Sequence, residues 1–235
     1  MRIEPAEELL LPIEVFIHTS IMRYKRNQVE EAICRTFSAE GARAVELKLR
    51  LKRLLVTDRR AGRGKRTPDN PKRHFAFYSH EAPGSGVEVM FSAYEAFALL
   101  TGLLMLEHGI PQATVVSILR QLRSDLERAH RETLRKDPRL LFDPHAVQAM
   151  AKPGMIAVDN RAPLFLVFVK LSVSTAERVD ELITVCEGHV AMNSFIQKHS
   201  AAGLGATFFE LVGLMHRLST NLVKTRPVKR GRSTI

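Results

Sequence analysis

The sequence contains no tryptophan, only two cysteines and few aromatic residues. These scarcities limit the classes of protein to which the chain can belong. Cys34 and Cys186 lie far apart in apolar surroundings without a CxxC pair, so we expect reduced core thiols rather than a disulfide framework. Long apolar runs are also lacking, because the run at residues 9–17 is broken by Pro12 and Glu14. This pattern argues against a secretory signal or a membrane span. We therefore expect a cytoplasmic protein without a membrane partner.

Motifs for catalysis and metal binding are scarce as well. Nine histidines occur without HxH, HExxH or a Cys/His cluster of ligand spacing. The GRGK stretch at residues 62–65 departs from a Walker A loop, because arginine rather than serine or threonine follows the lysine. Asp143 with His145, and Glu187 with His189, fit turn and cap roles better than acid–base roles. We expect no metal, no cofactor and no enzymatic activity.

Positive charge is what the chain has in excess. It carries 35 lysines and arginines against 25 acidic residues, a formal net charge of +10. Between residues 43 and 73 alone, twelve lysines and arginines stand against Glu46, Asp58 and Asp69, a local excess of nine. Cations clustered in this way predict a polyanionic partner, with nucleic acid as the first choice.

Hydrophobic periodicity predicts two helices around this basic stretch. Residues 27–37 place their apolar side chains on one helical face. Residues 42–58 fit both the alternation of a strand and a helical stripe, and their Glu, Leu, Lys and Arg content favours the helix. Residues 59–74 contain two glycines, two prolines and no large apolar side chain, which predicts a surface loop. Residues 75–79 and 87–91 flank EAPGSG and predict a β-hairpin.

A helical hairpin is predicted over residues 92–134. Ser92 and Glu95 have the spacing of a capping box at a helix start. The sequence HGIP at residues 108–111 then ends one helix and begins the next, with Gly109 suited to a left-handed cap. The second helix carries one apolar seam: Val115, Leu119, Leu122, Leu126 and Ala129. That seam predicts burial in the core or, alternatively, a homodimer interface through Leu119, Leu122 and Leu126.

After residue 138 the charge density falls and the pattern changes. Short apolar runs at residues 155–158, 164–169 and 182–186 predict buried strands, and residues 189–199 and 207–224 predict helices. We therefore expect an α+β, mainly helical fold.

Its N-terminal part is expected to be winged-helix-like, with a β-hairpin wing and a helical hairpin, and a small α/β part follows. The expected boundaries are a basic winged-helix-like domain at 1–140, an α/β sensing or assembly part at 141–224, and a basic tail at 225–235.

The order of two helices, β-hairpin and helical hairpin resembles the winged-helix DNA-binding domain of MerR-type regulators over residues 20–135. The stretch AFYSHEAPGSGVEVMFSAYEAFALLTGLLMLEHGIPQATVVSIL is similar to the passage from the wing to the following helix pair in that family. The resemblance implies DNA binding and a role in transcription regulation.

Charge alone predicts which residues would contact DNA. A basic helix can lie in the major groove, where Lys and Arg reach guanine N7 and O6, while nearby cations neutralise phosphates. The helix is expected to contribute Lys48, Arg50, Lys52 and Arg53. The loop and the start of the wing are expected to contribute Arg59, Arg60, Arg63, Lys65, Arg66, Lys72 and Arg73.

Three alternatives stay open. A second recognition face follows the HGIP turn and consists of Gln112, Thr114, Ser117, Arg120 and Gln121. RNA could replace DNA if Phe75, Phe77 and Tyr78 stack on unpaired bases. Lastly, the basic segment could dock on an acidic protein, which would make the chain a helical oligomerisation or adaptor protein.

Overall fold

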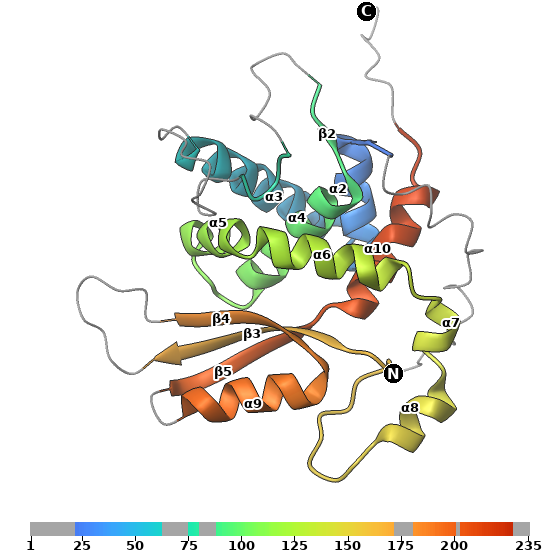
Figure 1. Cartoon of the computed structure of the whole chain (residues 1–235). Helices are drawn as coiled ribbons and strands as arrows, with labels where there is room; N and C mark the ends of the chain where they lie inside the picture. The colour runs from blue at the N-terminus through green and yellow to red at the C-terminus, as the bar shows by residue number, and fades with distance from the viewer. Residues whose placement is uncertain (1–21, 63–74, 80–87, 172–180, 201–202, 228–235) are drawn as a thin grey trace, which may run out of the picture. The chain divides into compact units, whose positions relative to one another are not determined.

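The computed structural model describes residues 22–62, 75–79, 88–171, 181–200 and 203–227. Within these residues the fold is mixed α+β and mostly helical, as expected (Figure 1). The chain divides into two compact units. The helical unit contains the described residues up to Glu127 together with those from Arg217 onward, and the sheet unit contains Arg128–His216. No helix among the described residues is long and apolar enough to cross a membrane.

The helical unit begins with two helices that the periodicity predicted. Its elements are β1 (Tyr24–Lys25), α2 (Arg26–Thr36), α3 (Gly41–Ala61), β2 (Met90–Phe91), α4 (Ala93–Glu107), α5 (Gln112–Gln121), the first turns of α6 (Arg123–Leu134) and the last turns of α10 (Val212–Lys224). The ambiguous segment is thus a helix, α3, which buries Leu47, Leu51, Leu54 and Leu55 on one stripe. The expectations for residues 27–37 and 42–58 are confirmed.

Helix α4 is the centre of this unit. Twelve of its 15 residues are buried, and a helix surrounded on every side needs apolar residues all round. Gly102 lets its neighbours approach closely, since a Cβ there would meet methyl groups of Leu54 on α3 and Leu119 on α5 at 3.2 and 3.3 Å. A larger side chain at this position would force α3 or α5 to shift.

The predicted caps of α4 are present. The Ser92 hydroxyl accepts a hydrogen bond from the Glu95 N–H at 3.1 Å, and the Glu95 carboxylate accepts one from the Ser92 N–H at 2.6 Å. Beyond the other end of α4, Gly109 has a φ of +79°, which is the left-handed conformation that favours glycine. Pro111 precedes α5 as its N-cap.

The second helix of the hairpin is interrupted, contrary to the single helix that the seam predicted. α5 ends at Gln121, Leu122 has φ −90° and ψ 5°, and α6 begins at Arg123. Leu119, Leu122 and Leu126 are 0%, 7% and 0% exposed. These leucines therefore belong to the core of the chain, and a homodimer would need a different surface.

The predicted wing hairpin is wrong for the described residues. Strand β2 pairs antiparallel with β1, and residues 75–79 form no strand. The reason is that side chains occupy their backbone groups: the Asp58 carboxylate accepts the N–H of Ala76 and Phe77, and Arg123 donates to carbonyls of this segment. The expected turn at residues 80–87 lies outside the described residues.

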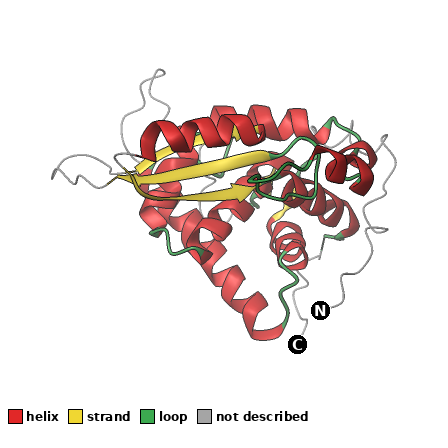
Figure 2. Cartoon of the chain, turned by 90° about the horizontal axis from the view of Figure 1, so that it is seen from below, coloured by secondary structure: helices red, strands yellow, loops and turns green. Residues whose placement is uncertain are grey.

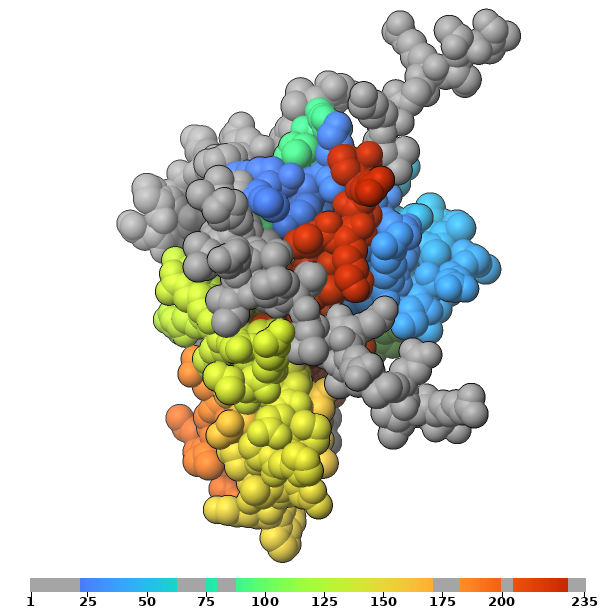
Figure 3. Space-filling view, turned by 90° about the vertical axis from the view of Figure 1, so that its right-hand side faces the viewer, coloured from blue at the N-terminus to red at the C-terminus, as the bar shows by residue number. Residues whose placement is uncertain are grey.

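The last described residues return to α2, as Figure 3 shows, with the red end of α10 against the blue of α2. Gln28 Nε2 donates to the Thr225 carbonyl at 2.9 Å, and Asn221 Nδ2 donates to the Thr36 hydroxyl at 3.1 Å. Thr225, which we placed in a basic tail, is buried. Residues 228–235 of the expected tail lie outside the described residues.

The sheet unit is an antiparallel sheet with a crossover helix. After α6 it contains α7 (Pro138–Leu141), α8 (Pro144–Met150), β3 (Leu164–Leu171), β4 (Glu181–Glu187), α9 (Gly188–Ser200), β5 (Gly203–Glu210) and the start of α10. The strand order is β4-β3-β5, and β3 is antiparallel to both neighbours. α9 therefore joins two edge strands of the same direction and packs on the sheet (Figure 1 and Figure 2). Its core contains Phe165, Val167, Cys186 and Met192.

The sequence predicted β3, β4 and α9 correctly and placed two segments wrongly. Residues 155–158 form no strand. Residues 207–210 belong to β5 rather than to a helix, because Thr207, Phe208 and Phe209 pair with β3. Glu210 then starts α10, since its carboxylate accepts the N–H of Val212 at 2.9 Å. Both cysteines are buried free thiols, as expected.

Two buried histidines make the sheet unit sensitive to acid. His130 and His216 are 7% and 1% exposed. Burial lowers the pKa of His130 to about 3, with a further decrease from the nearby His216. Burial likewise lowers the pKa of His216 to about 4, against a small opposing effect of Asp137. Both rings are therefore neutral in the folded protein above about pH 4.

We expect the free energy of unfolding to fall as the pH decreases from about 6.5 towards 4. The unfolded histidines bind protons below about pH 6.5 while the folded ones stay neutral, so each contributes a slope of up to about 1.4 kcal/mol per pH unit. Urea unfolding at several pH values measures this slope. His130→Gln and His216→Gln should reduce it, whereas His145→Gln, at an exposed position, should not. An unchanged slope in both buried variants would contradict the assignment.

Candidate nucleic-acid interface

The cations of α3 fall into two groups that differ in their partners. In the first half of the helix, three cations form ion pairs with neighbouring acids: Arg43 with Glu107, Lys48 with Glu31, and Arg50 with Glu46. Lys48 and Arg50 are also partly covered, with side chains 42% and 32% exposed. These positive charges are balanced locally, and a polyanion would have to compete with the carboxylates.

The second half of α3 presents positive charge without acidic partners. Lys52, Arg53, Arg59 and Arg60 are exposed, and none forms an ion pair with another described residue. Arg59 lies beside the Tyr78 hydroxyl, although burial dominates that group and raises its pKa. Cations near the C-terminal end of a helix also complement the helix dipole. We call these four residues the free cations.

The exposed face of α3 also carries aliphatic side chains. Val45, Leu49 and Val56 are 60%, 51% and 37% exposed. With Lys52 and Arg59 they follow spacings of four, three, four and three residues, so they share one face of the helix. This face is therefore mixed: Val45 and Leu49 lie towards the start of α3, and Val56 lies between Lys52 and Arg59.

The buried carboxylate of Asp58 connects the end of α3 to residues 76–77 and to Arg120. Asp58 is 0% exposed and accepts three hydrogen bonds: from the Ala76 N–H at 3.1 Å, from the Phe77 N–H at 3.0 Å and from Arg120 Nε at 2.7 Å. Arg120, itself 5% exposed, also donates to the Asp58 carbonyl oxygen. A buried ion pair is sustained only when the remaining hydrogen-bonding capacity is filled, and here it is largely filled.

A second pair, the partly buried Arg123 and the buried Glu95, extends this anchor to α4 and α6. Arg123 donates to the carbonyls of Phe75 and Tyr78 and lies 3.9 Å from the Glu95 carboxylate. Glu95 is 1% exposed and accepts a hydrogen bond from the Ser79 hydroxyl at 2.6 Å. We call Asp58, Arg120, Arg123 and Glu95 the buried anchor, because together they hold residues 75–79 in place.

The anchor brings both ends of the basic segment together. Gly62 is the last described residue before residues 63–74, and Phe75 is the first after them. The two are in contact, since a Cβ on Gly62 would come within 2.3 Å of the Phe75 ring. The segment therefore leaves and returns at one point beside the free cations. It carries the predicted contact residues Arg63, Lys65, Arg66, Lys72 and Arg73, which lie outside the described residues.

Burial affects the two alternative contact surfaces differently: in the second recognition face only Arg120 is buried, while Ser117 and Gln121 are exposed. Arg120, expected on a recognition face of the second hairpin helix, is paired with Asp58. Phe75, Phe77 and Tyr78 are 8%, 0% and 6% exposed, so their rings have no open surface on which a base could stack.

The sequence contains a signal for the buried Asp58 that a count of charges does not reveal. Asp58 follows Leu47, Leu51 and Leu54 at intervals of four, three and four residues, so it lies on the apolar stripe of α3. A lone carboxylate on such a stripe predicts a buried polar contact. The identity of its partner, 62 residues away, has no comparable signal. Among the described residues, no three potential metal ligands come together.

Removing one member of the buried pair should destabilise the helical unit. We expect Asp58→Ala to lower the free energy of unfolding by about 3–5 kcal/mol, because Arg120 would remain charged and buried without its partner. Urea unfolding followed by circular dichroism measures the change. Glu46→Ala is the matched control, since its pair with Arg50 is surface-exposed and exposed pairs contribute about 0–1 kcal/mol. Equal small effects of both substitutions would show that the anchor is not structural.

Comparisons with known protein families, with curated proteins and with solved structures found no significant match to this chain. What the chain binds therefore has to be inferred from its own charges, burial and contacts.

Proposed function

We propose that the chain binds nucleic acid, and duplex DNA foremost, through the last turns of α3 and the basic segment at residues 63–74. The observation that carries the proposal is the partition of charge along α3. Its early cations are balanced by carboxylates, while Lys52, Arg53, Arg59 and Arg60 have no acidic partner among the described residues. A polyanion can bind these four without breaking an ion pair.

The placement of the free cations suits a phosphate backbone. Residues 52–60 span about 12 Å of helix at 1.5 Å per residue, and duplex DNA presents a negative charge about every 1.7 Å along its axis. Several phosphates therefore fall within reach. The described residues on either side of segment 63–74, Gly62 and Phe75, are in contact at this end of α3. The segment contains five further cations, and we expect them to add to the local positive potential.

Duplex DNA is favoured over single-stranded RNA by the burial of the nearby aromatic rings. Sequence-tolerant binding to single strands relies largely on bases stacked on aromatic side chains, and Phe75 and Phe77 are in the core. A role in transcription regulation is the biological use that we infer from the resemblance in helix order to MerR-type regulators. The wing is not part of this proposal, because β2 pairs with β1.

A second candidate function is supported by the aliphatic side chains on α3. Val45, Leu49 and Val56 are exposed on the face that also carries Lys52 and Arg59. An acidic amphipathic helix of another protein could cover the apolar residues and pair with the cations. In this alternative the chain is an adaptor, and the apolar residues contribute to binding together with the charges.

Neutralising the free cations should weaken DNA binding and reduce its salt dependence. Each phosphate contact contributes about 0.9 to the slope of log Kobs against log salt concentration. Changing Lys52, Arg53, Arg59 and Arg60 to glutamine should therefore lower that slope by up to about 3.6. Fluorescence anisotropy with a labelled duplex, measured from 50 to 200 mM salt, provides the comparison.

A control variant with the same loss of charge separates local contact from net charge. It replaces four exposed cations of the sheet unit, namely Arg131, Arg135, Lys170 and Lys198, by glutamine. Binding that falls equally in both variants would point to a general charge effect. Binding that is unaffected by the α3 substitutions would overturn the proposal.

The two candidate functions predict different effects of the apolar substitutions. Changing Val45, Leu49 and Val56 to serine leaves every cation of α3 in place. If duplex DNA is the partner, we expect its affinity and salt slope to change by less than about twofold, since phosphate contacts carry non-specific affinity. If the partner is an acidic helix, binding of a designed acidic amphipathic peptide should weaken at least about tenfold, and the DNA titration should show no site on α3.

A further inference from the structure

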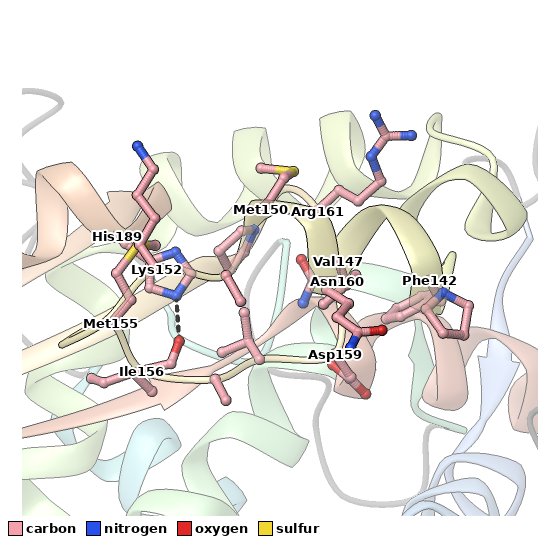
Figure 4. A pocket seen from close by; sticks show the side chains of 16 residues that line it. Phe142, Val147, Met150, Lys152, Met155, Ile156, Asp159, Asn160, Arg161 and His189 are labelled. Carbon is pink, nitrogen blue, oxygen red and sulfur yellow. Dashed lines mark hydrogen bonds between the residues drawn. The ribbon is translucent and has the colours of Figure 1, made fainter.

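The sheet unit contains a hollow that the proposed nucleic-acid interface does not involve. Its volume is about 480 Å³, and it lies between α8, residues 151–161, Pro163 before β3 and His189 at the start of α9 (Figure 4). Most of the side chains around it are apolar, among them Phe142, Val147 and Ile156. Sites for small molecules usually measure about 300–1,000 Å³ and have mainly apolar walls with few polar groups.

The walls of the hollow are not part of the packed core. Helix α8 buries none of its seven residues, although four of them line the hollow: Pro144, Val147, Gln148 and Met150. Met150, Met155 and Ile156 are 51%, 36% and 37% exposed. Large apolar side chains gathered around one opening are typical of an interaction site, and methionine adapts its shape to varied ligands.

The buried polar residue of the hollow, Asn160, already has hydrogen-bond partners within the protein. Asn160 is 3% exposed. Its Nδ2 donates to Glu210 Oε1 at 3.1 Å, and its Oδ1 accepts the N–H of Ala162 at 3.2 Å. Glu210 in turn holds the first N–H groups of α10. These hydrogen bonds hold Asn160 in place. The Glu210 carboxylate is bonded to the start of α10 and is not available to a ligand.

One polar atom on the wall has a defined role. His189 Nε2 lies 2.9 Å from the Ile156 carbonyl oxygen (Figure 4). A carbonyl oxygen can only accept, so in the neutral ring Nε2 carries the proton and Nδ1 is left as an acceptor. Lys152 and Arg161 are exposed, and in Figure 4 both extend away from the apolar side chains.

We propose that this hollow binds a compact, uncharged and largely apolar small molecule with one O–H or N–H donor, which His189 Nδ1 accepts. The charged residues that line the hollow are all exposed: Lys152, Asp159 and Arg161. A charged ligand would therefore lose its hydration against the apolar walls without a buried partner of opposite charge, which is costly. An apolar ligand instead covers Val147, Met150 and Ile156, and its single donor can be accepted by His189 Nδ1. The proposal does not depend on nucleic-acid binding.

The test uses N-phenyl-1-naphthylamine, an uncharged aromatic probe with one N–H donor, titrated into the full chain. We expect saturable binding of one probe per chain with a blue-shifted emission. Val147→Asp should weaken binding at least tenfold by placing a carboxylate in the apolar wall. Ala151→Trp, which fills the hollow without adding charge, should weaken it similarly. The matched control is Leu140→Asp, because Leu140 is 65% exposed in the same unit and does not line the hollow.

A second comparison tests the role of His189. The N-methylated probe has no donor, so it should bind the unaltered chain several-fold more weakly than N-phenyl-1-naphthylamine does. His189→Phe should bind both probes equally, because the acceptor is gone. Circular dichroism confirms that each variant is folded.

Three outcomes would overturn the proposal: binding that does not saturate, equal affinity in Val147→Asp, Ala151→Trp and the unaltered chain, or an equal loss in Leu140→Asp. A His189→Phe variant that still discriminates between the two probes would remove His189 from the site.

Discussion

The buried pair of Asp58 and Arg120 is the interaction on which the helical unit depends. It joins the end of α3 to α5, and through the Ala76 and Phe77 N–H groups it also fixes the chain where the basic segment ends. A charge removed from water in this way is tolerated only when its hydrogen bonds are made, which links three parts of the unit to one carboxylate: the end of α3, α5 and residues 76–77. The neighbouring Glu95 and Arg123 repeat the arrangement and add the start of α4 and of α6.

This anchor explains how a strongly basic segment can be attached to a stable fold. Like charges repel, and residues 43–73 carry an excess of nine positive charges. Three of these cations, Arg43, Lys48 and Arg50, are balanced by glutamates on α4, α2 and α3. Among the described residues of α3, the exposed cations without an acidic partner are Lys52, Arg53, Arg59 and Arg60, and the helix ends next to the point where Gly62 and Phe75 meet.

The described part of the sheet unit is held together differently, by a sheet packed against a helix rather than by buried ion pairs. Its antiparallel sheet is closed on one face by α9, and Glu210 couples the end of β5 to the start of α10. The remaining apolar side chains of α8 and residues 151–158 are only partly used in packing. The chain therefore combines one unit that carries the free cations with another that holds an apolar hollow, and these surfaces suit partners of different chemistry.

The sequence by itself determined what depends on local spacing: α2, α3, the Ser92–Glu95 cap, the left-handed Gly109, and the strands and helix from Leu164 to Ser200. Each of these follows from periodicity or capping chemistry within a few residues. Pairing across long separations was decided only by the tertiary structure. Strand β2 pairs with β1 instead of with residues 75–79. Residues Thr207–Phe209 belong to a strand instead of a helix. Arg120, predicted on a recognition face, is paired with Asp58. The same holds for the cations, since a sequence shows where lysine and arginine occur but not which of them a folded chain neutralises. Neutralisation requires a carboxylate brought close in space, and only folding sets that distance.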